Sequence, residues 1–572
     1  MAYFGIYHSD YSRLAGSFSD APCLTKGRMT LCARDAASQG GAVALLQGRL
    51  RNRKALAREL ECPHGAGDAR IALAAYLRWG EAYPSHLEGP VASCVMDTDA
   101  DAMVLSRDRM GEQSVFYSTR GERIAFADHP DSLLKSACAD SAVDIDGLRQ
   151  LFGLGPARLP GKTLYREMDM LEPGCALIVR DGHARVERYY RLEDRPHEDD
   201  LQTTVTRVRD LLEQAVEDIV ELSPSVMLSG GLDSTALTAL LSRRMRTLRS
   251  FSVDYQDNAR DFRANAFRPE PDAPYVLEAV RAFGTQHRTV TLDQASLARG
   301  MGRAMSLRGF PGMADIDSSL MLFSNEIARF DRYVTSGECG DEVFGGYPWF
   351  RGEAALEGFP WSGSLELRQS LLLPEIGEAL RLKDYVGDIF QSRKASADPG
   401  QGFEPKERRL RTMQRLCFDF FMPNLQERAV RMGEGAGIQI LTPLCDERLV
   451  EYVYNVPWEM KFMGGQEKGL FRAAMRDLLP QKLLHRVKSP YPKTCSPHFT
   501  RIIRHMASQM LSEPQAPIFQ LVDRARVSAI VDSELDPADT PWFGQLMAGP
   551  QMLGYLWQVN CWMKERNVTV VL

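Results

Sequence analysis

Residues 225–292 alternate between short apolar runs and runs with helical periodicity, and this alternation constrains the fold more than any other feature. The runs SVML, SFSVDY and HRTVTLD are typical of strands, whereas TALTALLSRRM and APYVLEAVRAFG are typical of helices. Strands that alternate with helices form a parallel sheet covered by those helices. The sequence therefore predicts an α/β region with a doubly wound parallel sheet.

The regions that flank this alternation have a different character. The first 190 residues contain short apolar stretches separated by turn signals, which predicts a mostly β domain with one helix at about 68–79. The polar stretch Glu193–Asp200 is interpreted as a linker, and the last 200 residues are mainly helical. Just after the linker, one helical face carries Val205, Val208, Leu211, Leu212, Ala215, Val216, Ile219 and Val220. We expect two domains, covering residues 1–195 and 203–572.

The turn after the first strand of the alternation reads Ser-Gly-Gly-Leu-Asp-Ser-Thr, residues 229–235. Two glycines let the backbone bend sharply and bring its N–H groups close to a ligand, while the following helix start favours an anion. The turn lacks the Lys of a Walker loop, so it suits pyrophosphate as a retained leaving group. Asp233 would need a Mg²⁺ ion between its carboxylate and the phosphates. The alternative is an ordinary strand-to-helix turn that Ser229 and Asp233 cap.

Charge and hydropathy exclude several classes of protein. The net charge is −6, so a broad basic surface for nucleic acid is not expected. The first residues do not form a signal peptide, and no run of about 18 uncharged apolar residues occurs. We expect a cytoplasmic protein that binds neither nucleic acid nor membrane. The oligomeric state stays open, a homodimer being one option.

The turn at 229–235 resembles the pyrophosphate loop of the ATP-pyrophosphatases, which cleave ATP between the α- and β-phosphates. Within that group the chain resembles the asparagine synthetases from about residue 140 onward, through segments that include RGFPGMADIDSSL, TSGECGDEVFGGYPWF, YNVPWEMKF and RVKSPYPKT. The resemblance implies an Ntn-hydrolase-like amidotransferase sandwich followed by an ATP-binding synthetase domain. It also implies an AMP-forming ligase that uses ATP and Mg²⁺ to adenylate a carboxylate and then joins it to an amine.

The resemblance assigns roles to individual residues. Asp233 and Asp341 match the aspartates that hold Mg²⁺, Glu338 matches a glutamate near the reacting amine, and Lys468 matches the lysine that stabilises the adenylating transition state. The expected ATP-binding set is Leu228, Ser229, Gly230, Gly231, Asp233, Ser234, Val253, Ser336 and Gly337. Asp315 and Asp317 either orient the substrate's amino group or cap a helix. Lys488 and Lys493 belong either to a loop near the phosphates or to a structural loop.

The resemblance does not extend to the residues with which the family binds and hydrolyses glutamine. Family members that hydrolyse glutamine carry a nucleophilic Cys after the initiator Met, whereas this chain has Ala2. Arg49 and Arg70 replace two acidic residues of the family's glutamine-holding segments. We therefore expect a folded but inactive amidotransferase-like domain.

The source of nitrogen follows from that loss and stays open. Ammonia, a partner protein or an amine on the substrate itself would replace glutamine, the last as in lactam synthetases and peptide cyclases of the same superfamily. In addition, Gln439 and Leu441 replace an acid and a base of the asparagine synthetases near the substrate. The carboxylate is therefore aspartate, another small molecule or a peptide. A rival of another class is a tRNA-modifying ATP-pyrophosphatase, which would need a basic RNA-binding appendage.

Overall fold

The structure is a computed structural model that describes residues 3–8, 23–26, 29–33, 35–120, 123–264, 268–352, 355–363, 365–535 and 541–572. Its contacts divide the chain into two compact units. The first unit comprises residues 1–147, 158–193 and 568–572, and the second comprises residues 148–157 and 194–567. Among the described helices, none combines the length and the apolar character needed to cross a bilayer.

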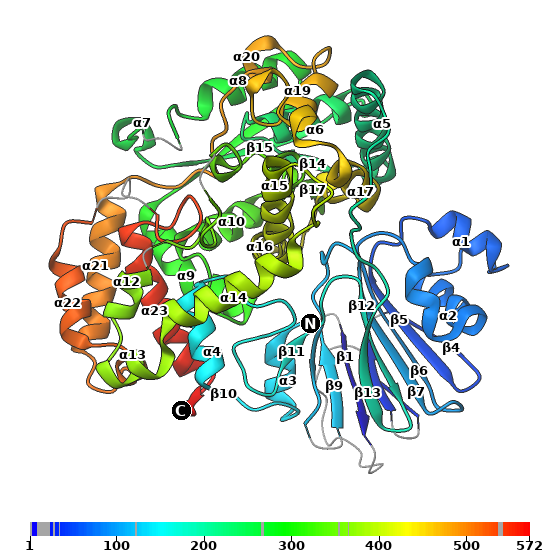
Figure 1. Cartoon of the computed structure of the whole chain (residues 1–572), viewed down its shortest axis with the longest axis horizontal. Helices are drawn as coiled ribbons and strands as arrows, with labels where there is room; N and C mark the ends of the chain where they lie inside the picture. The colour runs from blue at the N-terminus through cyan, green and yellow to red at the C-terminus, as the bar shows by residue number, and fades with distance from the viewer. Residues whose placement is uncertain are drawn as a thin grey trace. The chain divides into compact units, whose positions relative to one another are not determined.

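The first unit contains two six-stranded antiparallel sheets, which confirms the predicted β-rich sandwich (Figure 1). One sheet has the order β11 (Asp169–Met170), β8 (Phe116–Ser118), β9 (Arg123–Ala127), β1 (Tyr3–His8), β3 (Met29–Ala33) and β2 (Cys23–Lys26). The other has the order β13 (His183–Arg188), β12 (Cys175–Arg180), β7 (Ala102–Arg107), β6 (Val91–Asp97), β5 (Ala42–Gly48) and β4 (Ala36–Gln39). A short parallel pair joins β10 (Ala142–Val143) to β19 (Thr569–Val570).

Strand β5 shows why this unit needs both a second sheet and a helix layer. Its residues Val43 and Leu45 belong to the core between the sheets, whereas Ala44 and Leu46 belong to a second core formed with the helices α1 (Arg53–Glu59) and α2 (Asp68–Trp79). Successive residues of a strand point to opposite faces, so an apolar strand must be covered on both sides. The bounds of α2 confirm the helix that was predicted at about 68–79.

The second unit is built on a five-stranded sheet in which all paired strands are parallel. Its order is β16 (Gln286–Leu292), β15 (Arg249–Tyr255), β14 (Ser225–Met227), β17 (Tyr333–Thr335) and β18 (Gln439–Leu441). The chain adds β15 and β16 on one side of β14 and then returns to add β17 and β18 on the other, which confirms the doubly wound sheet. The switch point between β14 and β17 is where such sheets bind ligands.

The helices of the second unit connect these strands and form the predicted helical region (Figure 1). Those between and around the strands are α5 (Leu201–Val220), α6 (Leu232–Ser242), α7 (Asn258–Asp261), α8 (Ala273–Phe283), α9 (Gln294–Arg308), α10 (Asp315–Ile327) and α11 (Gly340–Phe344). The later ones are α12 (Leu365–Ser370), α13 (Pro374–Leu380), α14 (Leu382–Ala397), α15 (Pro405–Leu416), η4 (Cys417–Phe421), α16 (Met422–Ala436), α17 (Glu447–Asn455), α18 (Trp458–Lys461), α19 (Gly469–Ala474), α20 (Gln481–Leu484), α21 (Pro497–Ser512), α22 (Arg524–Asp532) and α23 (Gly549–Glu565). The short helices α3 (Pro130–Lys135) and α4 (Ile145–Arg149) precede them in the chain.

Candidate active site

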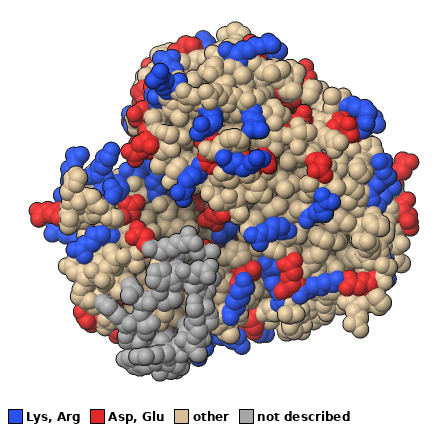
Figure 2. Space-filling model, turned by 180° about the vertical axis from the view of Figure 1, so that it is seen from behind, with Lys and Arg blue, Asp and Glu red and all other residues tan. Residues whose placement is uncertain are grey.

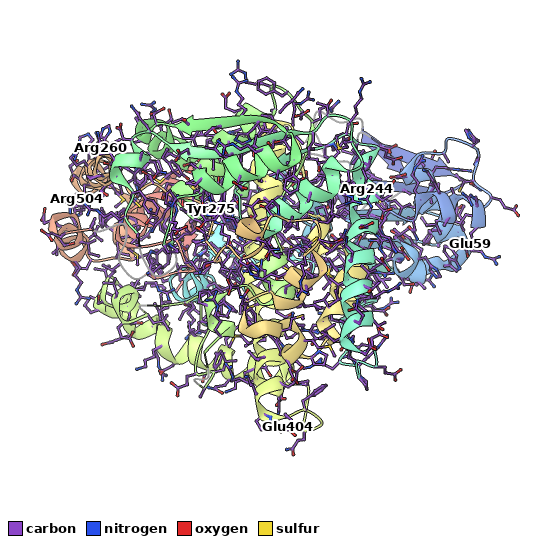
Figure 3. All side chains as sticks on the ribbon, turned by 90° about the horizontal axis from the view of Figure 1, so that it is seen from above. Glu59, Arg244, Arg260, Tyr275, Glu404 and Arg504 are labelled. Carbon is purple, nitrogen blue, oxygen red and sulfur yellow. The ribbon has the colours of Figure 1, made fainter. Side chains whose placement is uncertain are left out.

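The turn between β14 and α6 forms a bare backbone cradle. Gly230 has a φ of +70°, and a Cβ there would lie 2.7 Å from the backbone carbon of Tyr275, which Figure 3 labels. Glycine is therefore required at this position. The Ser229 N–H donates to Ser234 Oγ (3.2 Å), and within the described chain no side chain caps the start of α6. The first amides of this helix are thus available to an anion.

The loop after β17 closes against the same helix end. A Cβ at Gly337 would lie 2.8 Å from the Cβ of Asp233, and one at Gly340 would lie 2.8 Å from Asp233 Oδ1. Only residues without a side chain allow the two loops to approach so closely. The fold thereby brings Ser336, Gly337 and Glu338 beside the 229–235 turn, although about a hundred residues separate them in sequence.

Two lysines and two aspartates meet at this junction. Lys468 Nζ lies 2.6 Å from Asp233 Oδ2 and 2.7 Å from Asp341 Oδ1, and Lys488 Nζ pairs with Asp341 Oδ2. Burial alone would raise the pKa of Asp341, but the charges of Lys468 and Lys488 outweigh it and lower that pKa to about 2. A Cβ at Gly346 would fall 2.3 Å from Lys468 Cε, so this glycine makes room for the lysine.

The same junction suits a divalent cation. Asp233 and Asp341 already hold one cationic group, the Lys468 ammonium, between their carboxylates. In the described chain no cluster of three or more His, Cys, Asp or Glu side chains could hold a metal alone. Mg²⁺ commonly takes one or two carboxylates and completes its shell with phosphates and water. These two aspartates therefore fit a Mg²⁺ ion that arrives with a nucleotide.

Glu338 lies beside this charged cluster and faces Arg428. The half-buried Glu338 Oε1 is 3.6 Å from Arg428 Nη1, and the Arg428 guanidinium lies 4.5 Å from the centre of the Tyr491 ring. Burial raises the pKa of Glu338, and the positive charge of Arg428 limits that rise. A carboxylate so placed is suited to accept a proton from an attacking amine.

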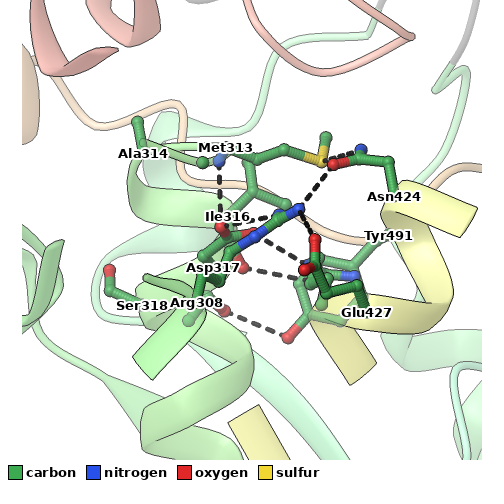
Figure 4. Close-up of polar contacts among 12 residues, drawn as sticks. Arg308, Met313, Ala314, Ile316, Asp317, Ser318, Asn424, Glu427 and Tyr491 are labelled. Atoms are coloured by element: carbon green, nitrogen blue, oxygen red, sulfur yellow. Dashed lines mark hydrogen bonds and ion pairs between the residues drawn. The ribbon is translucent and has the colours of Figure 1, made fainter. Parts of the chain in front are cut away.

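A buried ion network links Arg308 to Asp317 and Glu427 (Figure 4). Asp317 also contacts Arg428 and so holds it in place. Asp317 accepts Arg308 on one oxygen (3.2 Å) and contacts Arg428 Nε with the other (3.3 Å). Arg308 also pairs with Glu427 at 3.0 Å and donates to Asn424 at 2.7 Å. Buried charges of this kind are tolerated only when they are paired, so the network fixes the wall from which Arg428 projects.

Asp315 and Asp317 are placed behind the cavity wall. Asp315 is buried and accepts a hydrogen bond from Gln551 Nε2 (3.0 Å), and burial raises its pKa to about 6. Among the described residues that line the cavity, neither aspartate occurs. The structure thus places both carboxylates behind the residues that line the cavity.

The loops enclose a cavity of about 410 Å³, a size typical of ligand sites. The residues expected from sequence that line it are Leu228, Ser229, Gly231, Asp233, Ser234, Val253, Ser336, Gly337, Glu338, Asp341 and Lys468. Gly230 shapes the turn, as shown above. One cavity therefore brings together the expected nucleotide, metal and catalytic positions.

Several residues of the site were not expected from sequence. Arg486 Nη1 donates to the Ser229 carbonyl (2.8 Å), pairs with Asp272 and stacks 4.1 Å from the centre of the Tyr275 ring. Arg428 was not predicted either, because its ion-pair partners Asp317 and Glu338 lie far from it in the sequence. Each of the two alternatives for the loop of Lys488 and Lys493 applies to one of the lysines. Lys488 reaches Asp341 in the candidate site, whereas Lys493 Nζ donates to the Leu546 carbonyl (2.8 Å) and so has a structural role.

Two segments of the first unit depart in sequence from the pattern of glutamine-dependent family members, and the structure describes both. Asp68 pairs with Arg53 at 2.6 Å, so this carboxylate is already neutralised. A Cβ at Gly48 would lie 1.9 Å from the Pro90 carbonyl oxygen, which makes the Gln47–Gly48–Arg49 turn dependent on glycine. Ala2 lies outside the described residues.

Comparison with known proteins gives two family matches. The family described as asparagine synthase matches residues 207–564, and the glutamine amidotransferase domain family matches residues 36–190. The chain is 34% identical to "Asparagine synthetase [glutamine-hydrolyzing] 3" of Bacillus subtilis over 92% of this chain and 88% of the relative. It is 22% identical to "Asparagine synthetase [glutamine-hydrolyzing] 1" of the same organism, over 78% of this chain and 75% of the relative.

A solved structure also shows a likeness, at a low level. Glutamine phosphoribosylpyrophosphate amidotransferase from B. subtilis, complexed with ADP and GMP, is 14% identical over 50% of this chain and 59% of that one. Its TM-score is 0.23, so this likeness carries no structural argument.

Proposed function

This chain belongs to the asparagine synthase family, and we propose that it is an AMP-forming ligase that adenylates a carboxylate and transfers it to ammonia or an amine without using glutamine. ATP-dependent amidation is the family's chemistry. The observation that carries the finer proposal is the convergence of Asp233, Asp341, Lys468 and Glu338 on one cavity at the sheet's switch point.

The nucleotide would bind with its phosphates on the 229–235 turn and its base near Leu228 and Val253. The uncapped amides of α6 would bind the two distal phosphates, which leave together as pyrophosphate. Asp233 and Asp341 would hold Mg²⁺, which when bound neutralises phosphate charge. These residues thereby direct attack to the α-phosphorus, because the distal phosphates stay fixed in the cradle.

Lys468 would stabilise the adenylating transition state. Its ammonium is buried and lies between two carboxylates, so it is held without competition from water. Attack of a carboxylate on the α-phosphorus concentrates negative charge there, and a fixed cation lowers that barrier. The bond between the α-phosphorus and the bridging oxygen breaks, and pyrophosphate departs.

Glu338 would then take a proton from the amine that attacks the acyl-adenylate. Burial raises the pKa of Glu338, which makes its carboxylate a stronger base, and the charge of Arg428 3.6 Å away opposes that rise. The amide forms as the acyl–oxygen bond to AMP breaks. The products are AMP, pyrophosphate and the amide.

The proposed independence from glutamine rests on the first unit. The chain has Ala2 where glutamine-dependent members have their nucleophilic Cys, and Arg49 and Arg70 stand at acidic positions of the glutamine site. Ammonia or an amine of the substrate itself would supply nitrogen, which keeps intramolecular amide formation as the second candidate. The tRNA-modifying rival finds no support on the face shown in Figure 2, where acidic and basic side chains are interspersed.

The nitrogen donor can be tested directly. Purified protein is incubated with ATP, Mg²⁺ and a panel of carboxylates that includes aspartate, with either ammonia or glutamine, and released pyrophosphate and glutamate are measured. We expect pyrophosphate release to respond to ammonia and not to glutamine. Glutamate formation above the no-enzyme rate would refute the inactive assignment of the first unit while leaving the ligase assignment intact.

A further inference from the structure

We propose that the acyl donor is a carboxylate carried on a sizeable apolar or aromatic body, and that an apolar wall of the cavity recognises it. This inference rests on the proposed function and names its substrate class. The acyl wall is defined here as Met313, Phe421, Leu425, Ala429 and Leu546, all of which line the cavity.

Helix periodicity places most of this wall on one line. Phe421 ends η4 and the helix continues as α16, so Phe421, Leu425 and Ala429 are spaced by four residues and share one face. Met313 and Leu546 add apolar side chains from two other segments. Three distant segments therefore present the same kind of surface to one space.

Aromatic rings pack around Phe421 in the acyl wall. Its ring lies 5.3 Å from the Tyr347 ring, 5.3 Å from that of Trp361 and 6.0 Å from that of Phe543, measured between centres. Aromatic pairs at these separations stabilise each other beyond the burial of their area, so they favour the ring orientation seen here. A preformed apolar surface binds an apolar group without first having to order itself.

The acyl wall begins next to the residues that are proposed to act in the reaction. Arg428 precedes Ala429 on α16 and reaches Glu338, the proposed proton acceptor. An acyl group whose carbonyl lies near Glu338 would therefore extend its remaining part along Ala429, Leu425 and Phe421. Recognition and chemistry would share one helix face.

Free aspartate is a poor match for this wall. It carries an ammonium and a second carboxylate, and both need charged or strongly polar partners once they leave water. Among the described lining residues that come from α10, the segment before it, η4–α16 and the 543–547 loop, only Arg428 is charged. Arg428 is already occupied by Asp317 and Glu338. An apolar body gains stability from the same surface.

Two stable mimics of the adenylate test the inference without catalysis. Binding of 5′-O-[N-(3-phenylpropionyl)sulfamoyl]adenosine and of the β-aspartyl analogue is measured by calorimetric competition against ATP. We expect the phenylpropionyl mimic to bind at least 10-fold more tightly. Equal binding, or tighter binding of the aspartyl mimic, overturns the substrate class while adenylation stands; failure of both to displace ATP overturns the proposed function as well.

Variants locate the effect on the wall. Leu425→Gln keeps the side-chain volume but places an amide on the apolar stripe, and we expect it to reduce the preference for the phenylpropionyl mimic at least fivefold. Leu425→Met should retain the preference, and Leu367→Gln, at an exposed leucine of α12, serves as the matched control. Unchanged affinity for AMP shows that each variant is folded. An unchanged preference in Leu425→Gln refutes the role of the wall.

Discussion

The Asp315→Asn substitution separates a structural carboxyl group from a substrate contact. Asp315 is 1% exposed and is held by Gln551, and burial raises its pKa from 3.8 to about 6. The folded state therefore binds a proton that the unfolded state has lost, so the stability from this group is complete below pH 4 and disappears as the pH rises through 6. At about 1.4 kcal/mol per pKa unit, the loss is ~3 kcal/mol.

Asparagine cannot ionise, and it still offers an oxygen to Gln551. We expect Asp315→Asn to gain stability relative to the natural protein as the pH rises, by ~2 kcal/mol between pH 4 and pH 7. Differential scanning calorimetry at pH 4.5 and 7.5 would show a difference in Tm that widens by a few degrees.

The refuting result has two parts. A difference in Tm that stays constant across this pH range would show that Asp315 does not carry the burial cost deduced here. Loss of carboxylate-dependent AMP formation in Asp315→Asn, with unchanged stability, would favour the alternative in which Asp315 orients the substrate's amino group.

Three further predictions concern the charged junction. Lys468→Met should lower the rate of AMP formation by about 10²–10³-fold while leaving ATP affinity within a few-fold, because it removes a fixed cation from the transition state. The control is Lys383→Met, at a lysine whose side chain is 81% exposed. Equal rates of AMP formation in both variants would remove Lys468 from the mechanism. Arg428→Met should shift the acidic limb of the pH–rate profile to higher pH, since Glu338 loses the charge that opposes burial; an unmoved limb would contradict that pairing. Gly346→Ala should reduce activity at least tenfold with the fold retained, because its Cβ would lie 2.0 Å from Asp341 Oδ1; full activity would show that this junction can relax.

Local patterns in the sequence predicted much of the fold. The helix at 68–79, the strand–helix alternation at 225–292 and the 229–235 turn all depend on periodicity and glycine placement within a few residues. Such signals are short-range, and a single sequence carries them directly.

Ion pairs between residues that are distant in the sequence could not be predicted from such local patterns. Arg428 depends on Asp317, 111 positions earlier, and Asp317 depends in turn on Arg308, so no local spacing marks the network. The same holds for Lys488, whose partner Asp341 is distant in the chain. The grouping of residues 148–157 with the second unit and of 568–572 with the first also arises from contacts between remote segments. Spatial neighbours of this kind follow from topology alone.

The products formed from ATP show which phosphorus atom is attacked. The protein is incubated with Mg²⁺, ATP, ammonia and the carboxylate panel, including 3-phenylpropionate and aspartate, and the nucleotides and phosphates are separated and quantified. If the distal phosphates are held by the 229–235 turn while the α-phosphorus is attacked, AMP and pyrophosphate will appear in equal amounts. Release of ADP and orthophosphate would contradict the account.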